Sequence, residues 1–307
     1  MSQTLEISAV RSGGVELDTS PEKFGELRDS SDIAFNSEAL RERVEQDGYL
    51  FLPGLLDRDE VLAARADVAA RLHKTGHLMP GTDPLDCVAN PDCNLTFWPE
   101  LALNNEPLMR VLYEGPMMDF YERLLGEPVK HFDFTWFRAV APGASTYPHT
   151  DAVYMNRGTQ NLFTSWTPLG DLSREHGGLM VLENSHLHDK LRAGYSSKDV
   201  DTFCENKPGR SPFSGKNVGV RAGGSLSDNP YRLREAMGGR WLTSEFRAGD
   251  LLMFSIYTVH ASIENTSNQI RLSSDSRYQR ASEPADERWI GPNPPAHGPN
   301  AKRGLIC

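Results

Sequence analysis

The second half of the chain is dominated by short segments in which apolar and polar residues alternate, the pattern of strands that bury one face. Such segments, or short continuous apolar runs, cover residues 130–140, 161–169, 179–183, 241–246, 251–257, 260–263 and 269–278. In the first of them Phe132, Phe134 and Trp136 are expected on one face and Phe137 on the other. These strands suffice for two facing sheets. We therefore expect a mainly β fold (α+β) with flanking helices, whose core is a double-stranded β-helix, the cupin-like jelly roll.

The first half of the chain carries the spacing of helices instead. One helix is expected to end before Gly48 and to lead into a strand at residues 49–52. A second helix is expected to begin at Asp57, whose side chain can cap the first turn. Its apolar stripe consists of Val61, Ala64, Val68 and Leu72. A third helical region spans residues 106–126 and is expected to break near Gly115, so that helices brace the sheets.

The chain is expected to form a single domain over residues 36–307, because no linker divides it. An N-terminal arm at residues 1–35 lacks periodicity and is expected to be mobile or loosely packed. Residues 187–240 form an insertion between two core strands that holds ten Lys and Arg against six Asp and Glu. We expect this insertion to be a substrate lid that favours an anion, with a solvated elaboration or an oligomer contact as the alternative. The tail from Ala281 is expected to wrap irregularly over the surface.

The overall charge of −10 argues against nucleic acid or an anionic membrane surface as a partner, and a small molecule is expected instead. The sequence has no apolar leader and no run of eighteen apolar residues, so a soluble, cytoplasmic protein is expected. Its cysteines, Cys87, Cys93, Cys204 and Cys307, lack metal-binding spacing. We expect them to be free thiols in a reducing compartment.

A candidate metal site begins with His149 and Asp151. Residues two apart on a strand share a face, so this imidazole and this carboxylate converge while Thr150 points away. His260 ends an apolar run of strand length and can add a second imidazole. Two histidines and one carboxylate with open coordination positions are the ligand set of non-haem Fe(II) oxygenases.

A cation is expected beside this metal site. Arg271 lies eleven residues after His260, and a polar turn at residues 264–268 is expected to send the chain back antiparallel. A guanidinium in that place matches a carboxylate. His176, His186 and His188 compete as metal ligands, although His186 is better explained as a hydrogen-bonded structural residue.

These residues resemble the phytanoyl-CoA dioxygenase-like family of Fe(II)/2-oxoglutarate oxygenases over residues 47–278. The most specific matches are His149-Thr150-Asp151, Trp166-Thr167-Pro168-Leu169, Gly177-Gly178-Leu179 through Asn184-Ser185-His186, Ala248-Gly249-Asp250, and His260 with Arg271. The resemblance implies three iron ligands, which are His149, Asp151 and His260. It also implies that Arg271 binds the distal carboxylate of 2-oxoglutarate, and that Ser262 and Trp166 line the co-substrate pocket. The insertion is the long departure from the family pattern.

The resemblance implies an enzyme that uses O2 and 2-oxoglutarate to hydroxylate an unactivated carbon of a small molecule, with release of succinate and CO2. The substrate would be a natural product, an amino-acid-like compound or an acyl compound. Related halogenases lack the carboxylate ligand so that chloride can bind, whereas this chain retains Asp151. Desaturation, epoxidation and rearrangement use the same iron ligands and stay open. A non-catalytic jelly-roll binding module and a zinc hydrolase are the alternatives from other classes, but neither accounts for Arg271.

Overall fold

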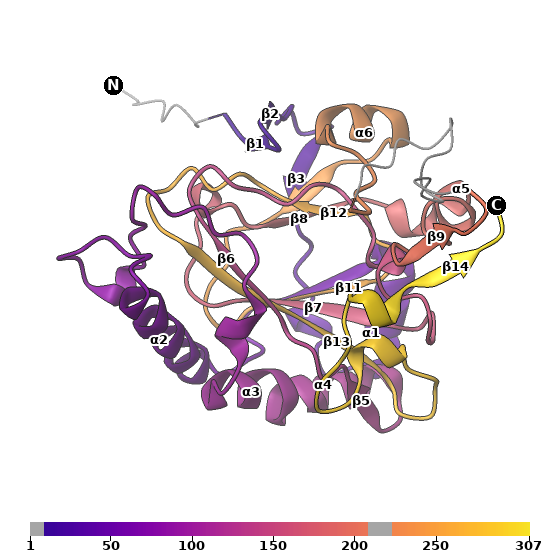
Figure 1. The fold of residues 1–307 in the computed structure, drawn as a ribbon, viewed down its shortest axis with the longest axis horizontal. Coiled ribbons are helices and arrows are strands. Elements are labelled where there is room, and N and C mark those ends of the chain that lie inside the picture. The colour runs from indigo at the N-terminus through magenta and orange to yellow at the C-terminus, as the bar shows by residue number, and fades with distance from the viewer. Residues whose placement is uncertain (1–8, 208–222) are drawn as a thin grey trace.

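Two β-sheets face each other in the computed structural model, which describes residues 9–207 and 223–307 (Figure 1). The larger sheet contains Tyr49–Leu52 (β4), Leu251–Ser255 (β11), Phe163–Pro168 (β7), Arg271–Arg280 (β13) and Val129–His131 (β5) in that order, and Trp136–Val140 (β6) also pairs with β13. The smaller sheet contains His260–Ser262 (β12), Leu179–Leu182 (β8), Trp241–Thr243 (β10) and Phe24–Glu26 (β3). Within both sheets all neighbours are antiparallel except β10 and β3. This is the predicted jelly-roll core.

Apolar side chains from both sheets fill the space between them. Trp166 on β7 lies opposite Leu252 on β11, and its ring meets Phe246 with centroids 4.7 Å apart. Val181 on β8 and Leu242 on β10 join the same cluster from the smaller sheet. The inner layer therefore holds Trp166 in a fixed position, fully buried.

Helices pack on the outer face of the larger sheet. They are Ser37–Asp47 (α1), Arg58–Lys74 (α2), Glu106–Tyr113 (α3) and Gly115–Leu125 (α4) (Figure 1). Asp57 caps α2 by accepting a hydrogen bond of 3.0 Å from the backbone N–H of Glu60, and the predicted apolar stripe of α2 is buried. Tyr278 on β13 stacks on Tyr121 of α4 with centroids 4.1 Å apart. The predicted helices and the break at Gly115 are confirmed.

The segment predicted as one strand at residues 130–140 is divided into β5 and β6. The expected two faces are nevertheless present, because Phe132 and Trp136 pack in one apolar cluster while Phe137 packs in another, beneath the helices. The division changes what the segment can pair with. β5 pairs with one end of β13 and β6 with the other.

The predicted hairpin at residues 264–268 is wrong. β12 belongs to the smaller sheet and β13 to the larger one, so the segment crosses between sheets instead of turning back within one. Asn265 stabilises the crossing, since its side-chain amide donates to the carbonyls of Val140 at 2.9 Å and Gln269 at 2.8 Å. Asn265 is fully buried, so a polar residue that suggested a surface turn is in fact part of the core.

The prediction of a loosely packed N-terminal arm is wrong for the described residues 9–35. The short strands Arg11–Ser12 (β1) and Val15–Glu16 (β2) pair with each other, and β3 extends the smaller sheet beside β10. Val10, Leu17 and Phe24 are buried in the same cluster as Trp241. Tertiary pairing with β10 stabilises a segment that has no internal periodicity.

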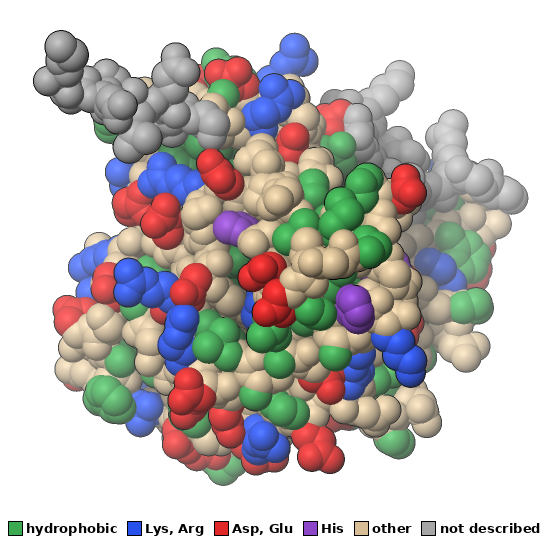
Figure 2. Space-filling model, turned by 90° about the vertical axis from the view of Figure 1, so that its left-hand side faces the viewer, with side chains coloured by type: hydrophobic (Ala, Val, Ile, Leu, Met, Phe, Trp, Pro, Cys, Tyr) green, Lys and Arg blue, Asp and Glu red, His purple; other side chains and the backbone are tan. Residues whose placement is uncertain are grey.

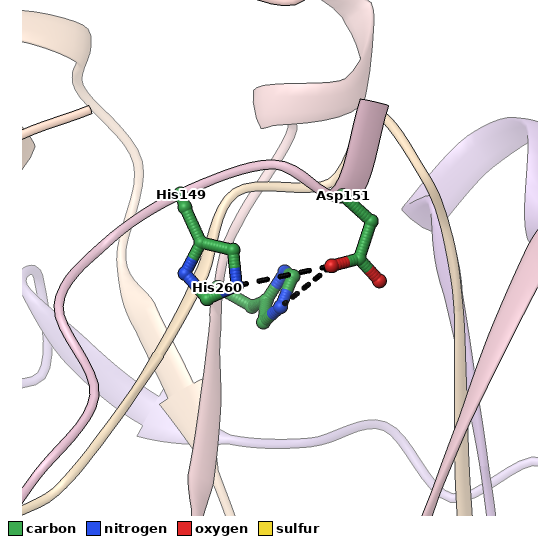
Figure 3. Close-up of side chains that lie close together, drawn as sticks. All are labelled: His149, Asp151 and His260. Atoms are coloured by element: carbon green, nitrogen blue, oxygen red, sulfur yellow. Dashed lines mark ion pairs between the residues drawn. The ribbon is translucent and has the colours of Figure 1, made fainter. Parts of the chain in front are cut away.

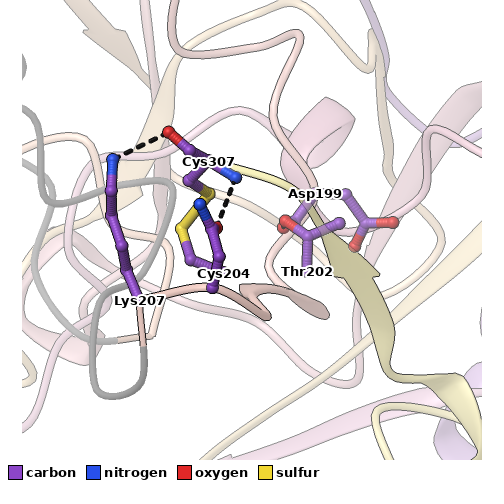
Figure 4. The surroundings of a disulfide bond; sticks show 6 residues. Asp199, Thr202, Cys204, Lys207 and Cys307 are labelled. Atoms are coloured by element: carbon purple, nitrogen blue, oxygen red, sulfur yellow. Dashed lines mark hydrogen bonds between the residues drawn. A yellow bond between two sulfur atoms is a disulfide. The ribbon is translucent and has the colours of Figure 1, made fainter.

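The insertion contributes Asp189–Ala193 (α5), Thr202–Cys204 (β9) and Pro230–Met237 (α6). β9 pairs in parallel with Arg303–Leu305 (β14) of the tail, which places Leu305 opposite Cys204. A disulfide joins Cys204 to Cys307, whose Cα atoms lie 5.5 Å apart (Figure 4). The prediction of free thiols is therefore wrong for this pair, because strand pairing brings together cysteines separated by 103 residues.

The C-terminal tail is more than the predicted surface wrap. Arg288 and Trp289 are buried, and β14 holds the end of the chain against β9. Near the disulfide, Lys207 Nζ donates to the Cys307 carbonyl at 2.7 Å (Figure 4). The tail and the insertion thus pack together as one region.

The face shown in Figure 2 carries interspersed acidic and basic side chains with hydrophobic patches between them. Basic side chains do not gather into a stripe on this face, which agrees with the acidic net charge of the chain. In the part of the chain that the structure describes, no helix has both the length and the apolar character needed to cross a membrane.

Candidate metal centre and substrate cavity

His149 and His260 form a cross-strand pair at the edge of the smaller sheet. The backbone N–H of each residue donates to the carbonyl of the other at 3.0 Å. Directly opposed residues of an antiparallel pair project to the same face, and here the imidazole centroids lie 4.2 Å apart. The strand predicted at His149 is limited to this bridge, because the chain enters a 3-10 helix at Asp151–Val153.

Asp151 reaches the same place because Thr150 keeps an extended backbone, with φ −113° and ψ 146°. One step of strand alternation is enough to turn Thr150 away, and its hydroxyl lies 3.0 Å from that of Ser196. The expected convergence of His149 and Asp151 therefore occurs without a regular strand.

Both imidazoles are oriented by the carbonyl two residues before them. Nδ1 of His149 donates to Tyr147 at 2.8 Å, and Nδ1 of His260 donates to Thr258 at 3.0 Å. A ring that donates from Nδ1 keeps a lone pair on Nε2. Burial lowers the pKa of His149 to about 3 and also lowers the pKa of His260, so both rings are neutral at neutral pH. Neutral imidazole is the form that binds a metal.

The two carboxylate oxygens of Asp151 have different surroundings. Oδ2 accepts hydrogen bonds from Thr164 Oγ1 at 2.5 Å and from Arg277 Nη2 at 2.9 Å. Oδ1 faces Nε2 of His149 at 3.8 Å and Nε2 of His260 at 3.7 Å (Figure 3). Burial opposes ionisation, but the Arg277 guanidinium and both histidines hold the pKa of Asp151 below its ordinary value. Asp151 is therefore ionised, with one oxygen anchored and one available.

These side chains fit a metal ion. The ligand atoms of His149, Asp151 and His260 all lie within 4.8 Å of one another, and all three residues are buried. Among the described residues no other group of three or more such side chains has this geometry. Two neutral imidazole nitrogens and one carboxylate oxygen match the donor set of non-haem iron.

The three competing histidines make hydrogen bonds in other parts of the fold. His186 Nε2 lies 3.1 Å from the carbonyl of Glu45, and His176 Nε2 lies 2.7 Å from Oε1 of Gln269. His188 accepts a hydrogen bond from the backbone of Leu191 at the start of α5. Each of them has a structural role that accounts for it.

A cavity of about 370 Å³ lies against the candidate metal centre. His149 and Asp151 form part of its lining, together with Arg138 and Arg277. Aromatic side chains make much of the remaining wall, namely Phe97, Trp136, Tyr147 and Tyr154. The cavity can therefore hold a largely apolar small molecule that carries an anionic group.

Arg271 is a buried cation, 1% exposed, and it forms no ion pair with any described residue. Its Nη1 donates to Ser273 at 3.3 Å, whereas its Nε has no partner in the described part of the chain. Burial and the neighbouring Arg138 lower the pKa of Arg271 to about 9. A buried guanidinium with unused donors is suited to receive a carboxylate.

Arg277 and Arg138 are two further functional candidates, because both line the cavity. Arg271, Ser273, Asp275 and Arg277 alternate along β13, so they share one face. Arg138, opposite Ser273 on β6, donates from Nε to Asp275 at 2.6 Å. The Arg277 guanidinium lies 4.1 Å from the centroid of the Trp136 ring. The alternation in the sequence could have revealed this row, but its link to Asp151 depends on tertiary pairing.

Trp166 and Ser262 take different positions relative to Arg271. The Trp166 ring centroid lies 5.9 Å from the Arg271 guanidinium. The Ser262 hydroxyl accepts a hydrogen bond from the backbone N–H of Thr146 at 2.8 Å, and within the described residues it makes no hydrogen bond with Arg271. Ser262 thus positions the segment that leads to His149.

The insertion, which was expected to be a substrate lid, and the C-terminal tail, which was expected only to wrap over the surface, both reach the cavity. Ser225 of the insertion and His297 of the tail both line it. Leu226 of the insertion donates its backbone N–H to the carbonyl of Pro148 at 2.8 Å, and Tyr154 donates its hydroxyl to the carbonyl of Gly223 at 2.8 Å. Residues 208–222, which form part of the predicted lid, lie outside the described residues. No local pattern marks Ser225 or His297, because both are placed by contacts with distant segments.

Known proteins are similar to this chain in sequence. A family model described as phytanoyl-CoA dioxygenase matches residues 44–273. Two curated relatives are described as 1-deoxypentalenic acid 11-beta-hydroxylase. The protein of Streptomyces arenae is 25% identical over 294 residues, covering 92% of this chain and 95% of its own length. That of Streptomyces exfoliatus is 26% identical over 289 residues, covering 91% and 93%.

A solved structure supports the fold. The non-haem α-ketoglutarate-dependent carbocyclase SnoK from nogalamycin biosynthesis matches with a TM-score of 0.58 at 18% identity, covering 84% of this chain and 89% of the other. The jelly-roll architecture is therefore shared with an enzyme whose sequence is otherwise far removed.

Proposed function

The chain belongs to the phytanoyl-CoA dioxygenase family, and from this premise we propose that its substrate is a small natural product that carries a carboxylate and is hydroxylated at an aliphatic carbon. As a member of the family, the chain is a non-haem dioxygenase that consumes 2-oxoglutarate and uses iron. Both curated relatives are hydroxylases whose substrate is named as an acid, which supports the proposed substrate class.

The arrangement of the three ligand atoms carries the proposal. His149 and His260 would hold iron through Nε2 and Asp151 through Oδ1, since these atoms face one another while Oδ2 of Asp151 is engaged by Arg277. Bound iron supplies the activation of O2 that accompanies conversion of 2-oxoglutarate to succinate and CO2. A carboxylate held through Oδ2 would ligate through one oxygen only, which leaves coordination positions for the co-substrates.

We assign the distal carboxylate of 2-oxoglutarate to Arg271. Its guanidinium is buried without an ion-pair partner among the described residues, so a carboxylate would supply the missing counter-charge. Trp166 would support this guanidinium from one side, and Ser262 would act by fixing the approach to His149.

We assign the carboxylate of the substrate to Arg138. Its Nε is fixed by Asp275, while its terminal nitrogens have no hydrogen-bond partner among the described residues and its side chain is 20% exposed. Arg138 lines the cavity, whereas Arg271 is not in the lining. Phe97 and Trp136 would contact the apolar body of the substrate, and Ser225 would bring the insertion into the wall around it.

A crossed pair of variants tests these assignments. The enzyme is loaded with Fe(II) and supplied with 2-oxoglutarate and 1-deoxypentalenic acid or its methyl ester, and succinate and the oxygenated product are measured. Arg271→Met should raise the apparent constant for 2-oxoglutarate by at least about tenfold, the loss expected for a charge-assisted contact. Arg138→Met should instead raise the KM for the acid and leave that for the ester unchanged.

Several results would reject the proposal. Failure of the wild type to form succinate would contradict an oxygenase, as a non-catalytic binding module or a zinc hydrolase would form none. Equal use of the acid and the ester by the wild type would contradict the proposed carboxylate site. If Arg138→Met raised only the apparent KM for 2-oxoglutarate, then Arg138 rather than Arg271 would bind the 2-oxoglutarate carboxylate.

A further inference from the structure

The C-terminal tail places a histidine in the wall of the cavity, away from the metal ligands. His297 lines the cavity, and its ring lies between Trp289, with centroids 4.7 Å apart, and Tyr154, with centroids 5.7 Å apart. Tyr154 in turn contacts His149 with centroids 5.6 Å apart. One aromatic ring therefore separates His297 from the candidate metal centre, so a small molecule bound beside the metal can also reach His297.

The tautomer of His297 is determined by a buried carboxylate. Nδ1 of His297 lies 2.8 Å from Oδ2 of Asp201, which is 1% exposed. Burial opposes ionisation of Asp201, but hydrogen bonds from His297, Lys302 and Arg288 hold its pKa at about 2. A carboxylate can only accept, so Nδ1 of His297 must donate. Burial lowers the pKa of His297, so the ring is neutral and Nε2 carries a lone pair.

Asp201 is held by a cluster of opposite charges. We call the tail cluster the carboxylates Asp199, Asp201 and Asp286 with the cations Arg157, Arg288 and Lys302. Three carboxylates face three cations, so the cluster is balanced without a charge on His297. No buried side-chain nitrogen or oxygen of these six residues lacks a hydrogen-bond partner. A neutral His297 is thus held in place by a cluster that does not need it as a counter-ion.

Nε2 of His297 is available for a ligand. Within residues 9–207 and 223–307 it makes no hydrogen bond, and the side chain is 34% exposed. An aromatic nitrogen with a free lone pair in a cavity wall is a hydrogen-bond acceptor, which complements the donors of Arg138. The two residues would therefore recognise different groups on one molecule.

We propose that His297 is a specificity-determining residue whose Nε2 accepts a hydrogen bond from a hydroxyl group of the substrate. The inference rests on the proposed function, because it concerns a second group on the same substrate. The preferred substrate carries a hydroxyl in addition to its carboxylate. His297 positions that substrate and takes no part in the oxidation itself.

Rigid acids that differ by one hydroxyl group test this inference. Adamantane-1-carboxylic acid is compared with 3-hydroxyadamantane-1-carboxylic acid, and adamantane-1-acetic acid with 3-hydroxyadamantane-1-acetic acid, so that two lengths are covered. Each acid is titrated by calorimetry, without oxygen, into the enzyme loaded with Fe(II) and 2-oxoglutarate. The quantity compared is the ratio of the dissociation constants within a pair, which cancels contributions from the carboxylate and the apolar cage.

The ratio is the dissociation constant of the acid divided by that of its hydroxy acid. For at least one pair, we expect this ratio to be about three- to tenfold larger for the wild type than for His297→Phe, because one hydrogen bond is lost in the variant. Phenylalanine keeps the ring beside Trp289 and Tyr154 but has no acceptor. His297→Gln retains an acceptor oxygen and should keep part of the preference. Melting temperatures followed by circular dichroism check that each variant is folded.

His77→Phe is the matched control. The His77 ring also contacts a tryptophan, Trp98, with centroids 5.1 Å apart, and its Nδ1 lies 2.9 Å from Oγ1 of Thr75, but it does not line the cavity. This variant should keep the wild-type ratio. An unchanged ratio in His297→Phe for both pairs, or no measurable binding of either hydroxy acid to the wild type, overturns the inference. Absence of succinate formation by the wild type would instead overturn the proposed function, and calorimetry without oxygen is independent of that result.

Discussion

Two mostly buried groups of charged side chains differ in whether the protein itself supplies all of their partners. The site cluster, which we define as Arg138, Asp151, Arg271, Asp275 and Arg277, sets three guanidinium groups against two carboxylates. Nε of Arg271 and both Nε and Nη1 of Arg277 have no partner in the described part of the chain. The tail cluster balances three cations with three carboxylates and leaves none of their buried atoms unpaired.

This difference separates positions that bind ligands from positions that maintain the fold. A buried charge without a partner destabilises a protein, so its retention indicates that something else completes it. In the site cluster the completing groups would be a metal ion beside Asp151 and a carboxylate beside Arg271. The tail cluster is complete without a ligand, and its role is to hold β9, the tail and His297 together.

Removal of the Asp151 carboxylate should have the largest effect on activity and stability. Asp151→Ala deletes a proposed metal ligand and leaves Arg277 buried without its carboxylate. We expect a loss of more than about a hundredfold in iron-dependent succinate formation, and a decrease of about 3–5 kcal/mol in the free energy of unfolding. Iron content, succinate yield and urea denaturation measure these effects.

The two histidines of the proposed metal centre are the controls for Asp151. His149→Ala and His260→Ala should also abolish turnover, because each removes a ligand, but they leave no charge without a partner. Their free energies of unfolding in the metal-free state should therefore change much less than that of Asp151→Ala. Near-normal activity of the His260 variant would reject the ligand assignment.

Arg288→Met tests the balanced cluster. Arg288 pairs with Asp199 at 3.1 Å, with Asp201 at 2.8 Å and with Asp286 at 2.5 Å, so its removal leaves buried carboxylates short of a cation. We expect the free energy of unfolding to fall by about 3–5 kcal/mol. Activity per folded molecule at low temperature should persist, because no iron ligand is touched.

Arg58→Met is the control for Arg288→Met, since Arg58 pairs with Asp171 at the surface. This substitution should lower the free energy of unfolding by less than about 1 kcal/mol. A similar loss of stability in both variants would show that the tail cluster contributes no more than a surface ion pair.

Thr164→Val should have the smallest effect. The substitution removes one of the two hydrogen bonds to Oδ2 of Asp151 and nearly conserves volume. We expect iron affinity to fall by about tenfold or less, the lower end of the range for residues that orient a ligand. Thr167→Val on the same strand is the matched control, because the Thr167 hydroxyl is buried without a partner among the described residues. Equal iron affinities of the two variants would show that Thr164 does not position Asp151.

Local patterns in the sequence were sufficient to predict most helices and strands. The cap at Asp57, the stripe of α2 and the alternation of β13 each depend on neighbouring residues. The three candidate iron ligands could also be identified, because His149 and Asp151 are two residues apart, His260 ends an apolar run of strand length, and the resemblance to a known family implies the same three residues. Their role as ligands stays a prediction until iron binding is measured.

Features that depend on distant contacts could not be predicted. The crossing at residues 264–268 resembles a hairpin turn, and only the pairing of β12 with β8 shows that the chain changes sheets. The Cys204–Cys307 disulfide and the position of His297 require the pairing of β9 with β14. A deletion of residues 196–228 made to test the lid would also remove Asp199 and Asp201 and would therefore disrupt the tail cluster.

The single bridge between His149 and His260 limits how the length of the chain can vary among related proteins. Val140 is fixed by its pairing with β13, and His149 is fixed by its pairing with His260. One residue added or lost between these two positions would disrupt the backbone hydrogen bonds that hold residues 143–146 beside residues 262–265, next to the His149–His260 bridge. We therefore expect relatives that keep the iron chemistry to tolerate insertions and deletions within residues 187–240 but not within residues 141–148.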